Sequence, residues 1–496
     1  MNYADSEKIH MLLSQAGLVK VEEWDEADIV IFNTCSVRQK SEDKVFGYIE
    51  EIQKMKEKTG KNIVVGMTGC MTRKTGINKK YYDYQGRHNT TKIELLPLHG
   101  IQSTEYKVQN EKIIGSDNQQ NKWNELNQTN ASLFNSDDEL FIRTENIDFV
   151  VRIEEIGALT TILSLIYHED IGQDDSFQSY LRVRQERESN GSANIIVQTG
   201  CDNFCTFCIV PYTRGKEVSR PLNDIVEEAK DAVKNGAKEI TLLGQNVNSY
   251  GKETRKNLWN PEELTWESAS VRTPFRELLE ALNEIEGLDR IRFTSSNPHD
   301  MTRDILDAHF DLEKCCHYLH FALQSGDNDL LKKMNRKHTY NDFKTIVDYL
   351  RSRDPLFGIS TDIIVWFPGE TDKQFENTVK AFHECQFDFT YNARYSPRKQ
   401  TYAAKMPWHI PANIKAERWD KLNALMYEII QQRNQLMIGR EEIILISKID
   451  EEHETVSGRT RNFREVFAPK NESLRIGELI PVKITDIDRW VLRGKY

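Results

Sequence analysis

Between positions 194 and 395, two kinds of hydrophobic pattern alternate along the chain. Short β-rich runs (NIIVQ, EITLL, RIRFT, YLHFAL, STDIIVWF and FDFTYNARY) are separated by segments of helical period such as LNDIVEEAKDAVKNG and FRELLEALNEIEG. Strands separated by such helices are parallel and joined by right-handed crossovers. Six repeats predict an open, partial (β/α)6 barrel, in which functional residues gather at the carboxyl ends of the strands.

A smaller α/β unit precedes this barrel. The runs DIVIFNTC and NIVVGMTGC indicate buried strands that end in Cys35 and Cys70, and IGALTTILSLIY indicates a helix that closes the unit. Between the second of these strands and the helix, residues 74–145 are polar, and residues 110–130 alone contain six Asn and three Gln. Such a stretch buries too little apolar surface to offset its ordering entropy, which predicts a mobile insertion.

A third module follows the barrel. The segment NIKAERWDKLNALMYEIIQQRNQLM predicts an exposed amphipathic helix, and short strands such as EIILISKI and PVKITDI follow it. A module of this size and pattern suits a small β-barrel. The chain is therefore α/β, with predicted domains at residues 1–185, 190–425 and 437–496.

The composition of the chain limits the number of domains, the cellular compartment and the role of the cysteines. The 496 residues, 39% of them hydrophobic, exceed what one compact core usually absorbs. No apolar run approaches the roughly 20 residues of a membrane span, and the N-terminus lacks a signal-peptide pattern, so we expect a cytoplasmic, monomeric protein without a membrane partner. A net charge of -11 argues against a protein that coats nucleic acid generally, but it leaves room for a local basic groove. Eight cysteines are too few for a disulfide scaffold, so clustered thiols indicate metal ligands or catalysts.

Three cysteines stand together directly after the first predicted barrel strand. In the run GCDNFCTFC, Cys201, Cys205 and Cys208 can hold three irons of a [4Fe-4S] cluster and leave the fourth iron open. The open iron can chelate S-adenosylmethionine, whose one-electron cleavage yields a 5'-deoxyadenosyl radical. Phe204 and Phe207 are expected to keep the loop apolar and to limit solvent access. A zinc site is the alternative, but zinc normally needs a fourth Cys or His or a second CxxC pair, and the sequence has no such pair nearby.

Five ordered motifs resemble those of one enzyme family. They are TGCDNFCTFCIVPYTRGKEVSRP, ITLLGQNVNSYG, FALQSGDNDLLKKMNR, TDIIVWFPGET and YSPRKQT. They closely resemble the radical S-adenosylmethionine methylthiotransferases, over nearly the whole chain except residues 74–145. Within that family, NTCSVR, VPYTRGKEVSRP and LLGQNVNSYG are most similar to the enzymes that convert N6-isopentenyladenosine, beside the anticodon of tRNA, to its 2-methylthio derivative. Relatives that act on threonylcarbamoyladenosine or on a ribosomal-protein aspartate differ at these places.

The resemblance implies a fold and a mechanism. It implies a flavodoxin-like α/β N-terminal domain, a radical SAM barrel and a C-terminal TRAM domain, with tRNA as partner and a flavodoxin or ferredoxin as electron donor. In such enzymes the radical removes hydrogen from C2 of the adenine, and an auxiliary [4Fe-4S] cluster supplies a sulfur methylated by a second S-adenosylmethionine. An unactivated aromatic C–H offers no acidic proton, so we expect no His/Asp/Ser constellation and no catalytic residue beyond the cluster ligands. The alternatives are the same chemistry on another tRNA or on a protein, and a tRNA-binding homologue that does not insert sulfur.

The second cluster raises a specific expectation. The resemblance implies three cysteine ligands, two of them Cys35 and Cys70 and the first in a GCQMN motif. This chain opens with Met1 and Asn2, so we expect the third ligand and its strand to be missing. Two hypotheses compete: translation starts upstream of Met1, or the protein has lost sulfur insertion.

Cofactor contacts are expected at three strand ends. The residues are Gly244, Gln245 and Asn246 after the second strand, Gln324 with Ser325 and Gly326 after the fourth, and Asp362, Gly369 and Glu370 at the fifth. Glycine lets backbone approach a ligand, and side-chain amides offer donors and acceptors. The resemblance places these residues near S-adenosylmethionine, and plain strand-to-loop turns are the alternative for the first two groups.

Two residues depart from the family pattern. Trp366 stands where the family usually has glycine, and Asn297 stands where a histidine is usual. A bulky side chain at a position of close approach could narrow the pocket or shift the strand.

Arginines supply the candidate substrate contacts. Arg214 and Arg220 flank the cysteine loop and suit bidentate bonds to a phosphate or a carboxylate, with surface solvation as the alternative. In the tail, the run GRTRNFREV, which contains Arg459 and Arg461, and the run RWVLRG both combine basic and aromatic residues. RNA-binding barrels show this combination, although a module with only a packing role would look similar. The remaining thiols of Cys315, Cys316 and Cys385 lack metal spacing and are expected to be buried as small hydrophobes.

Overall fold

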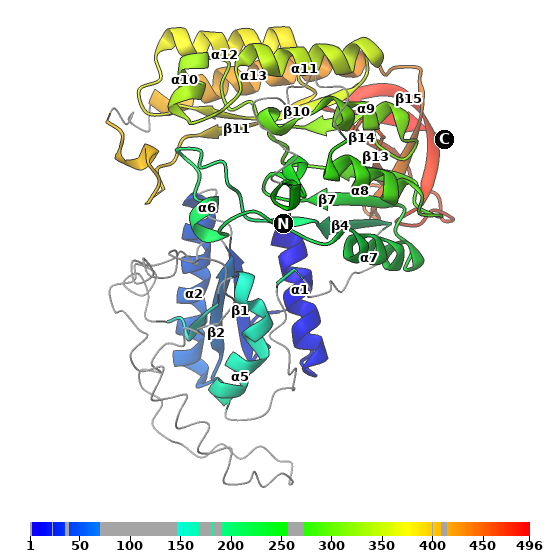
Figure 1. Ribbon diagram of the computed structural model, residues 1–496. Helices are drawn as coiled ribbons and strands as arrows, with labels where there is room; N and C mark the ends of the chain where they lie inside the picture. The colour runs from blue at the N-terminus through cyan, green and yellow to red at the C-terminus, as the bar shows by residue number, and fades with distance from the viewer. Residues whose placement is uncertain are drawn as a thin grey trace. The chain divides into compact units, whose positions relative to one another are not determined.

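The chain divides into two compact units, residues 2–186 and 187–496 (Figure 1). The computed structural model describes residues 2–21, 23–34, 39–69, 146–151, 153–167, 180–181, 191–255, 272–398, 400–407 and 414–496. The predicted insertion at 74–145 lies outside the described residues, as do Cys35 and Cys70.

The first unit is a three-stranded parallel sheet with helices. Its elements are α1 (Asn2–Gln15), β1 (Ile29–Thr34), α2 (Gln39–Thr59), β2 (Val64–Gly69), β3 (Phe149–Val150), a 3-10 helix η2 (Ile153–Ala158) and α5 (Leu159–Tyr167), with strand order β1-β2-β3. Both predicted strands and the closing helix are confirmed. β2 is buried along its whole length, and the ring of Phe149 lies so close to Gly66 that an added Cβ would approach it to 2.2 Å. Thr34 and Gly69, the last residues of the two strands, are register partners.

The second unit begins with six parallel strands, and the six predicted runs are confirmed. They are β4 (Ser192–Ile196), β7 (Glu239–Leu243), β8 (Arg290–Phe293), β9 (Tyr318–His320), β10 (Gly358–Val365) and β11 (Phe389–Arg394). They pair in the orders β4-β7-β8 and β11-β10-β9, and parallel bridges such as Ile291 to Cys315 and Ser296 to Phe321 join β8 to the second sheet. β4 and β11 therefore lie at the two edges of an open, partial barrel.

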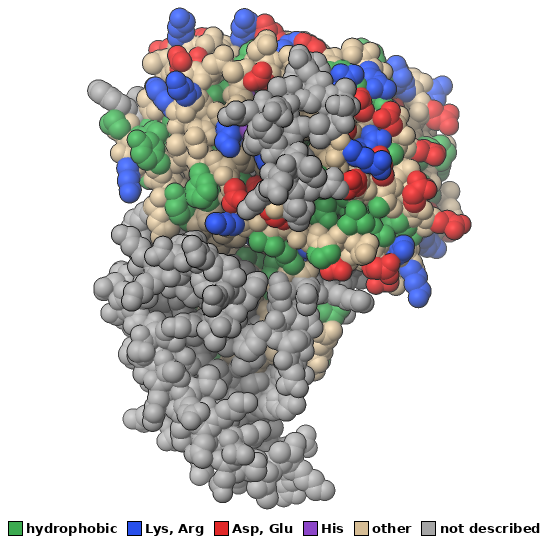
Figure 2. Space-filling model, viewed as in Figure 1, with side chains coloured by type: hydrophobic (Ala, Val, Ile, Leu, Met, Phe, Trp, Pro, Cys, Tyr) green, Lys and Arg blue, Asp and Glu red, His purple; other side chains and the backbone are tan. Residues whose placement is uncertain are grey.

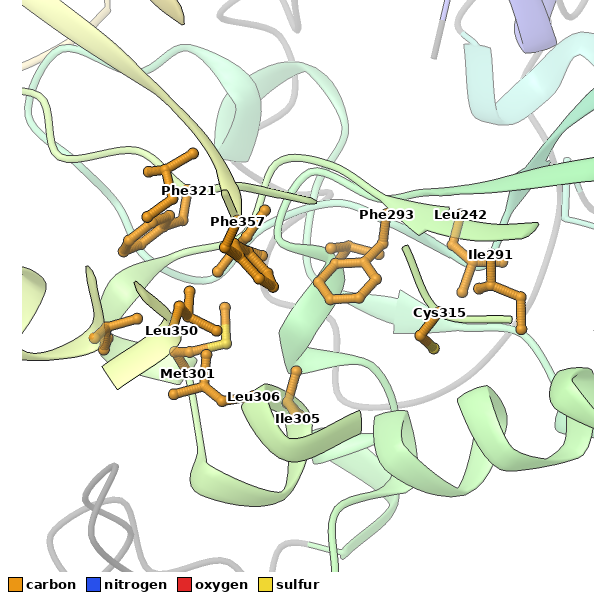
Figure 3. Close-up of a cluster of buried hydrophobic side chains, with 14 of the residues drawn as sticks. Leu242, Ile291, Phe293, Met301, Ile305, Leu306, Cys315, Phe321, Leu350 and Phe357 are labelled. Carbon is orange, nitrogen blue, oxygen red and sulfur yellow. The ribbon is translucent and has the colours of Figure 1, made fainter. Parts of the chain in front are cut away.

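Helices cover the outer face of this sheet. They are α7 (Leu222–Lys234), α8 (Pro274–Asn283), α9 (Arg303–Asp311), α10 (Asn328–Lys333), α11 (Tyr340–Arg353), α12 (Asp372–Cys385) and α13 (Ile414–Gln435). A continuous apolar core lies between sheet and helices, and includes Leu242, Phe293, Ile305 and Leu350 (Figure 3). Capping boxes begin α11 and α12 and satisfy the first amide groups of each helix.

The inner face of the sheet carries a different set of side chains. Along β10, Ile359 and Ile363 belong to the outer core, so Ser360 and Asp362, which alternate with them, point to the inner face. Across the register, Ser360 pairs with Phe389 and Asp362 with Tyr391, so these aromatic residues share that face.

A five-stranded closed barrel follows α13, as the sequence predicted. Its strands are β12 (Glu441–Asp450), β13 (Thr455–Arg459), β14 (Glu465–Pro469), β15 (Leu479–Asp488) and β16 (Val491–Lys495), in the order β12-β13-β14-β16-β15.

The small barrel packs against the amino ends of the parallel strands. A Cβ at Gly358, the first residue of β10, would lie 2.3 Å from the Asn462 carbonyl, and a Cβ at Gly191, before β4, would lie 2.2 Å from Gly477. This packing places residues 187–496 in one compact unit. The predicted boundary at position 437 stays a prediction.

Among the described residues, no helix is both long and apolar enough to cross a membrane. On the face shown in Figure 2, acidic and basic side chains are interspersed.

Candidate functional site

The cysteine loop is closed by a small antiparallel ribbon at the carboxyl end of β4. Residues Gln198–Thr199 (β5) pair with Val218–Ser219 (β6), so the three cysteines lie in the loop of a hairpin. Gly200 has φ +80, and a Cβ there would meet the Lys216 carbonyl at 1.9 Å. Glycine is thus required where the loop leaves the ribbon.

Residues from the ends of other strands hold this loop. The Thr206 amide donates to the Met334 carbonyl (3.0 Å), and the Ala403 amide donates to the Thr206 carbonyl (2.8 Å). The Asn335 side chain donates to the Phe204 carbonyl (3.0 Å). The loop is therefore fixed by segments that follow β9 and β11, at the edge of the sheet where the sequence predicted the site.

Phe204 departs from its expected role. It adopts φ 48 and its side chain is 52% exposed, so it does not shield the loop from solvent. Phe207 packs against a small buried cluster that includes Leu330 and Phe367, as expected. An exposed aromatic residue in a left-handed conformation is costly, and such strain concentrates at functional loops.

The three thiols have the chemistry that an iron–sulfur cluster requires of its ligands. Cys201, Cys205 and Cys208 are all partly exposed and free of disulfides. Within the described ranges, no three His, Cys, Asp or Glu side chains are grouped closely enough to hold one metal ion. In a cubane each thiolate binds a different iron, which requires wider separation around one loop. Burial raises the pKa of the Cys201 thiol, so cationic irons would be needed to hold it as a thiolate.

An arginine without a predicted role lies against the triad. One nitrogen of the Arg336 guanidinium is 3.4 Å from the Cys205 sulfur, while the other donates to the Ala322 carbonyl and to Asn297 Oδ1 (3.0 Å). Asn297, the residue that departs from the family histidine, thus orients Arg336. The motif FALQSGDNDLLKKMNR contained this arginine, but nothing in its spacing indicated a contact with the triad.

The residues after β7 meet a buried carboxylate. Gly244 follows the strand directly, and the Asn246 side chain donates to Asp300 (2.8 Å) and to Glu217 (3.3 Å). Burial raises the pKa of Glu217, which also accepts a hydrogen bond from Ser249 (2.9 Å). The Oε1 atom of Gln245 is buried without a hydrogen-bond partner among the described residues. An unpaired buried amide oxygen beside an acidic group suits a ligand that brings donors.

The residues after β9 divide into two groups. Gln324 adopts φ 74 and bridges to β10 through backbone hydrogen bonds with Asp362 and Ile364, and its buried Oε1 also has no partner in the described part of the chain. Ser325 and Gly326 instead pack against α12, where a Cβ on Gly326 would approach the Asn377 carbonyl to 2.4 Å. Gln324 is therefore a ligand candidate, and the other two have a structural role.

Trp366 explains why glycine is usual at its position. Its φ is 64, a conformation that costs a residue with a side chain about 1–2 kcal/mol. The indole does not narrow the inner face, because it belongs to the outer core and the Arg418 guanidinium of α13 stacks on it at 3.8 Å. Arg418 also pairs with Glu370 (2.9 Å), whose carboxylate accepts the Trp366 amide (2.7 Å). Burial raises the pKa of Glu370 to about 7, although the Trp366 amide and Arg418 oppose the shift.

Gly369 and the two flanking arginines occupy different settings. Gly369 has φ 76 and open space where a side chain would stand, with only Lys333 Nζ near 4 Å. Arg220 is buried, donates to the Ile196 carbonyl (2.8 Å) and pairs with Glu228 (2.6 Å). Arg214 is buried at the end of the short helix α6 (Val210–Thr213). The Arg220 guanidinium is thus engaged inside the protein, and its substrate role stays a prediction.

The inner face holds a constellation that the sequence analysis did not expect. Ser360 Oγ is 2.9 Å from His320 Nδ1, and His320 Nε2 is 3.2 Å from Asp362 Oδ2. The expectation of no His/Asp/Ser constellation is therefore wrong. A signal existed, since His320 lies in one predicted strand and Ser360 and Asp362 alternate on the next, but only the strand register brings them together.

The arginines of the small barrel also have partners. Arg461 donates to the carbonyls of Glu313 and Cys315 in the parallel barrel, so its guanidinium is engaged in packing. Arg459 stacks on Phe463 at 3.9 Å. Cys315, Cys316 and Cys385 are buried, as predicted.

Three family models match consecutive parts of the chain. The radical SAM superfamily matches residues 195–382, the uncharacterized protein family UPF0004 matches residues 1–84, and the TRAM domain matches residues 435–496. Among curated proteins, the chain is 35% identical over 497 residues to a tRNA-2-methylthio-N(6)-dimethylallyladenosine synthase of Clostridium novyi (strain NT), covering 100% of this chain and 94% of the relative. It is also 35% identical to the synthase of that name from Thermoanaerobacter sp. (strain X514), covering 100% of this chain and 90% of the relative.

The chain belongs to the radical SAM methylthiotransferase family. The resemblance inferred from five motifs is thus confirmed, as are the radical SAM barrel and the TRAM barrel. Membership of the radical SAM superfamily implies a [4Fe-4S] cluster and S-adenosylmethionine as cofactors. Which residues of this methylthiotransferase hold them stays a prediction.

Proposed function

We propose that this protein is a tRNA methylthiotransferase that adds a 2-methylthio group to N6-isopentenyladenosine beside the anticodon. The full-length similarity to synthases of that name carries the proposal. The hairpin loop with three partly exposed thiols at the carboxyl end of a parallel barrel supports it independently.

The proposed cluster ligands are Cys201, Cys205 and Cys208. When bound, the cluster supplies one electron to S-adenosylmethionine, whose cleavage gives a radical able to remove hydrogen from an unactivated carbon. Beside it, Arg336 contacts the Cys205 sulfur at 3.4 Å. Glu217 suits an ammonium group, because it is a partly buried acid that accepts a hydrogen bond from the Asp202 amide, next to Cys201 in the sequence. Gln245 and Gln324 offer buried amide oxygens to ligand donors.

The second part of the proposal is an auxiliary cluster that involves Cys35 and Cys70. Both residues lie outside the described part of the chain. Support comes from the described strands, because Thr34 and Gly69, which precede the two cysteines, are register partners at the ends of β1 and β2. Adjacent ends of parallel strands are a place where one cluster can be shared.

The proposed partners follow from the reaction. tRNA is the substrate, a flavodoxin or ferredoxin supplies the electron, and the enzyme acts as a monomer. A tRNA substrate would place the enzyme in the cytoplasm.

Nucleoside mass spectrometry of tRNA tests the function. In a strain that lacks this gene, unmethylthiolated N6-isopentenyladenosine should accumulate, and a plasmid copy should restore the 2-methylthio derivative. A matched plasmid with Cys205→Ala should not restore it. Unchanged tRNA in the deletion strain would defeat the substrate assignment.

A further inference from the structure

A cluster of aromatic and polar side chains lines the inner face of the barrel beside its open edge. We call Phe389, Tyr391, Asp362 and His320 the inner-face cluster. They come from three neighbouring strands, and the register aligns Asp362 with Tyr391. β11, which carries both aromatic residues, is the edge strand of its sheet.

The polar half of the cluster is an oriented carboxylate. A line of hydrogen bonds runs from the Tyr318 hydroxyl to Ser360 (2.7 Å), from Ser360 to His320 (2.9 Å) and from His320 to Asp362 (3.2 Å). The His320 side chain is 10% exposed, whereas that of Asp362 is 40% exposed. His320 contacts only the Oδ2 atom, and within the described residues no hydrogen bond reaches Oδ1. The line therefore holds one carboxylate oxygen toward solvent as an acceptor.

The aromatic half offers uncovered ring surface. Phe389 is 37% exposed and Tyr391 is 43% exposed, although most large hydrophobic residues of this unit are buried. Their rings lie 4.9 Å apart at 68°, and the Tyr391 ring lies 5.5 Å from that of His320. Exposed aromatic faces next to a hydrogen-bond acceptor are the means by which proteins recognise an unstacked base.

The small barrel contributes a cation to the same place. Phe463 stacks on Tyr318 at 4.3 Å, and Arg459 stacks on Phe463 at 3.9 Å. Burial raises the pKa of Tyr391, Arg459 lowers it and Asp362 raises it, which shows that both charges act on the Tyr391 hydroxyl. Arg459 is joined to the cluster through Phe463 and Tyr318, whose hydroxyl begins the line of hydrogen bonds, and we expect it to pair with the backbone of a nucleic acid strand whose base enters the cluster.

We propose that the inner-face cluster is the binding site for an extruded purine base that carries an apolar group on N6. Tyr391 stacks on the ring, Asp362 accepts the N6 hydrogen, Phe389 contacts the apolar group and Arg459 pairs with the adjoining phosphate. The inference rests on the proposed function and specifies how the barrel recognises its substrate. The TRAM barrel would then help to form the pocket as well as hold the RNA.

Anisotropy of labelled anticodon stem-loop RNA tests the site without the loaded enzyme. The full chain is titrated into two RNAs that carry either N6-isopentenyladenosine or adenosine at the target position. The wild type should prefer the isopentenylated RNA about tenfold, because several buried CH2 or CH3 groups contribute to binding. Tyr391→Ala should weaken binding of both RNAs about tenfold through lost stacking. Phe389→Ala should abolish the preference between them.

Two variants separate these effects from misfolding. Tyr427→Ala is the matched control, since Tyr427 on α13 is 44% exposed and lies outside the cluster, and it should bind as the wild type does. Tyr391→Phe keeps the ring and should keep the affinity. If Tyr391→Ala and Phe389→Ala both bind the two RNAs as the wild type does, the inference is overturned.

A second readout distinguishes this inference from the proposed function. With 2-aminopurine at the target position, the fluorescence should rise when wild-type protein extrudes the base and should rise less with Tyr391→Ala, whereas Asp362→Asn should leave the rise unchanged because this base has no N6 hydrogen. If the wild type forms 2-methylthio product in tRNA while every cluster variant keeps wild-type binding and fluorescence, only the base site fails. If the wild type neither binds the isopentenylated RNA nor modifies tRNA, the proposed function fails and the base site fails with it.

Discussion

The two ends of the partial barrel differ in what their buried polar side chains contact. At the carboxyl end, Gln324 and Trp366 hold left-handed backbone conformations, and each has a buried side-chain polar atom without a partner in the described ranges. At the amino end, the fully buried Arg290 and Arg292 donate to four backbone carbonyls of the TRAM barrel. At the carboxyl end, two strained residues with unpaired buried atoms thus lie where ligands are expected, whereas Arg290 and Arg292 tie the opposite end to the TRAM barrel.

Two buried carboxyl groups show the same contrast. At the carboxyl end, Glu370 has one close arginine, Arg418, and burial raises its pKa to about 7. At the amino end, burial alone would raise the pKa of Asp388, but Arg464, Arg433 and Arg351 outweigh it and hold the pKa below its usual range. One neighbouring arginine is therefore too little to offset the rise in pKa that burial causes, whereas three arginines outweigh it.

The largest expected effect is loss of chemistry at the carboxyl end. Cys205→Ala should abolish formation of deoxyadenosine from S-adenosylmethionine, because two thiolates cannot hold the cluster with its open iron. Binding of tRNA should persist. Cys385→Ala is the control, since that thiol is buried against α11 and should leave cleavage intact. Deoxyadenosine formation by Cys205→Ala would refute the role of the triad.

The next largest effect concerns stability at the amino end. Arg292→Met leaves Glu239 buried without its 2.8 Å partner and frees the carbonyls of Thr460 and Arg461. Breaking such a buried pair costs about 3–5 kcal/mol, which urea unfolding would measure. Arg303→Met, which removes a partly exposed pair with Asp307, should cost less than about 1 kcal/mol. Equal losses in the two variants would show that the amino end is not specially stabilised.

A smaller effect is expected at Trp366. Trp366→Gly relieves about 1–2 kcal/mol of backbone strain but loses a buried aromatic side chain worth about 3–5 kcal/mol. The variant should therefore be less stable by about 2 kcal/mol in urea unfolding while it retains S-adenosylmethionine cleavage, because the indole faces the helices. Trp366→Phe keeps a ring and removes the unpartnered N–H, so it should lose less. A gain in stability for Trp366→Gly would mean that strain outweighs packing.

The smallest effect is a difference in pH dependence. The pKa of Glu370 is raised from 4.5 to about 7, so the folded state binds more protons than the unfolded state in that interval, and stability falls as pH rises through it. The fall in stability is gradual, at most about 1.4 kcal/mol for each pH unit in this interval. Asp388 acts oppositely, because its lowered pKa adds stability above the unfolded value, and this stability is lost as the pH falls below about 4. Unfolding curves of Glu370→Gln should lack the fall between pH 4.5 and 7 and keep the loss at low pH. A curve identical to the wild type would remove Glu370 as the cause.

The sequence predicted the elements of this fold well, because they depend on local patterns. The six parallel runs, the helix α13 and the small closed barrel all follow from hydrophobic periodicity and appear where expected. The cysteine triad was also predictable from the sequence, because its three cysteines lie within eight residues and their spacing is a local property of the chain. The exposure of individual side chains was less predictable. Phe204 was expected to shield the cysteine loop, but it is largely exposed to solvent.

Contacts between distant residues required the folded chain. Arg336 reaches Cys205 across 131 positions of sequence, and His320 reaches Asp362 across 42. Neither pair has a spacing that a motif could encode, because strand register and loop packing set both distances. Arg220 and Arg461 show the opposite relation between sequence and structure. Their residue type and neighbouring motifs suggested contacts with substrate, but in the folded chain their guanidinium groups have partners inside the protein.

By itself, the sequence determined the class of chemistry, the family and the order of three modules, because short motifs and periodic patterns are properties of neighbouring residues. The tertiary structure decided which side chains meet. It turned the Trp366 indole toward the helices, closed the amino end of the barrel with TRAM carbonyls, and left Tyr391 and Asp362 facing solvent together. The physical reason is that burial and hydrogen bonding depend on the whole packed arrangement, whereas secondary structure and metal-ligand spacing are largely local.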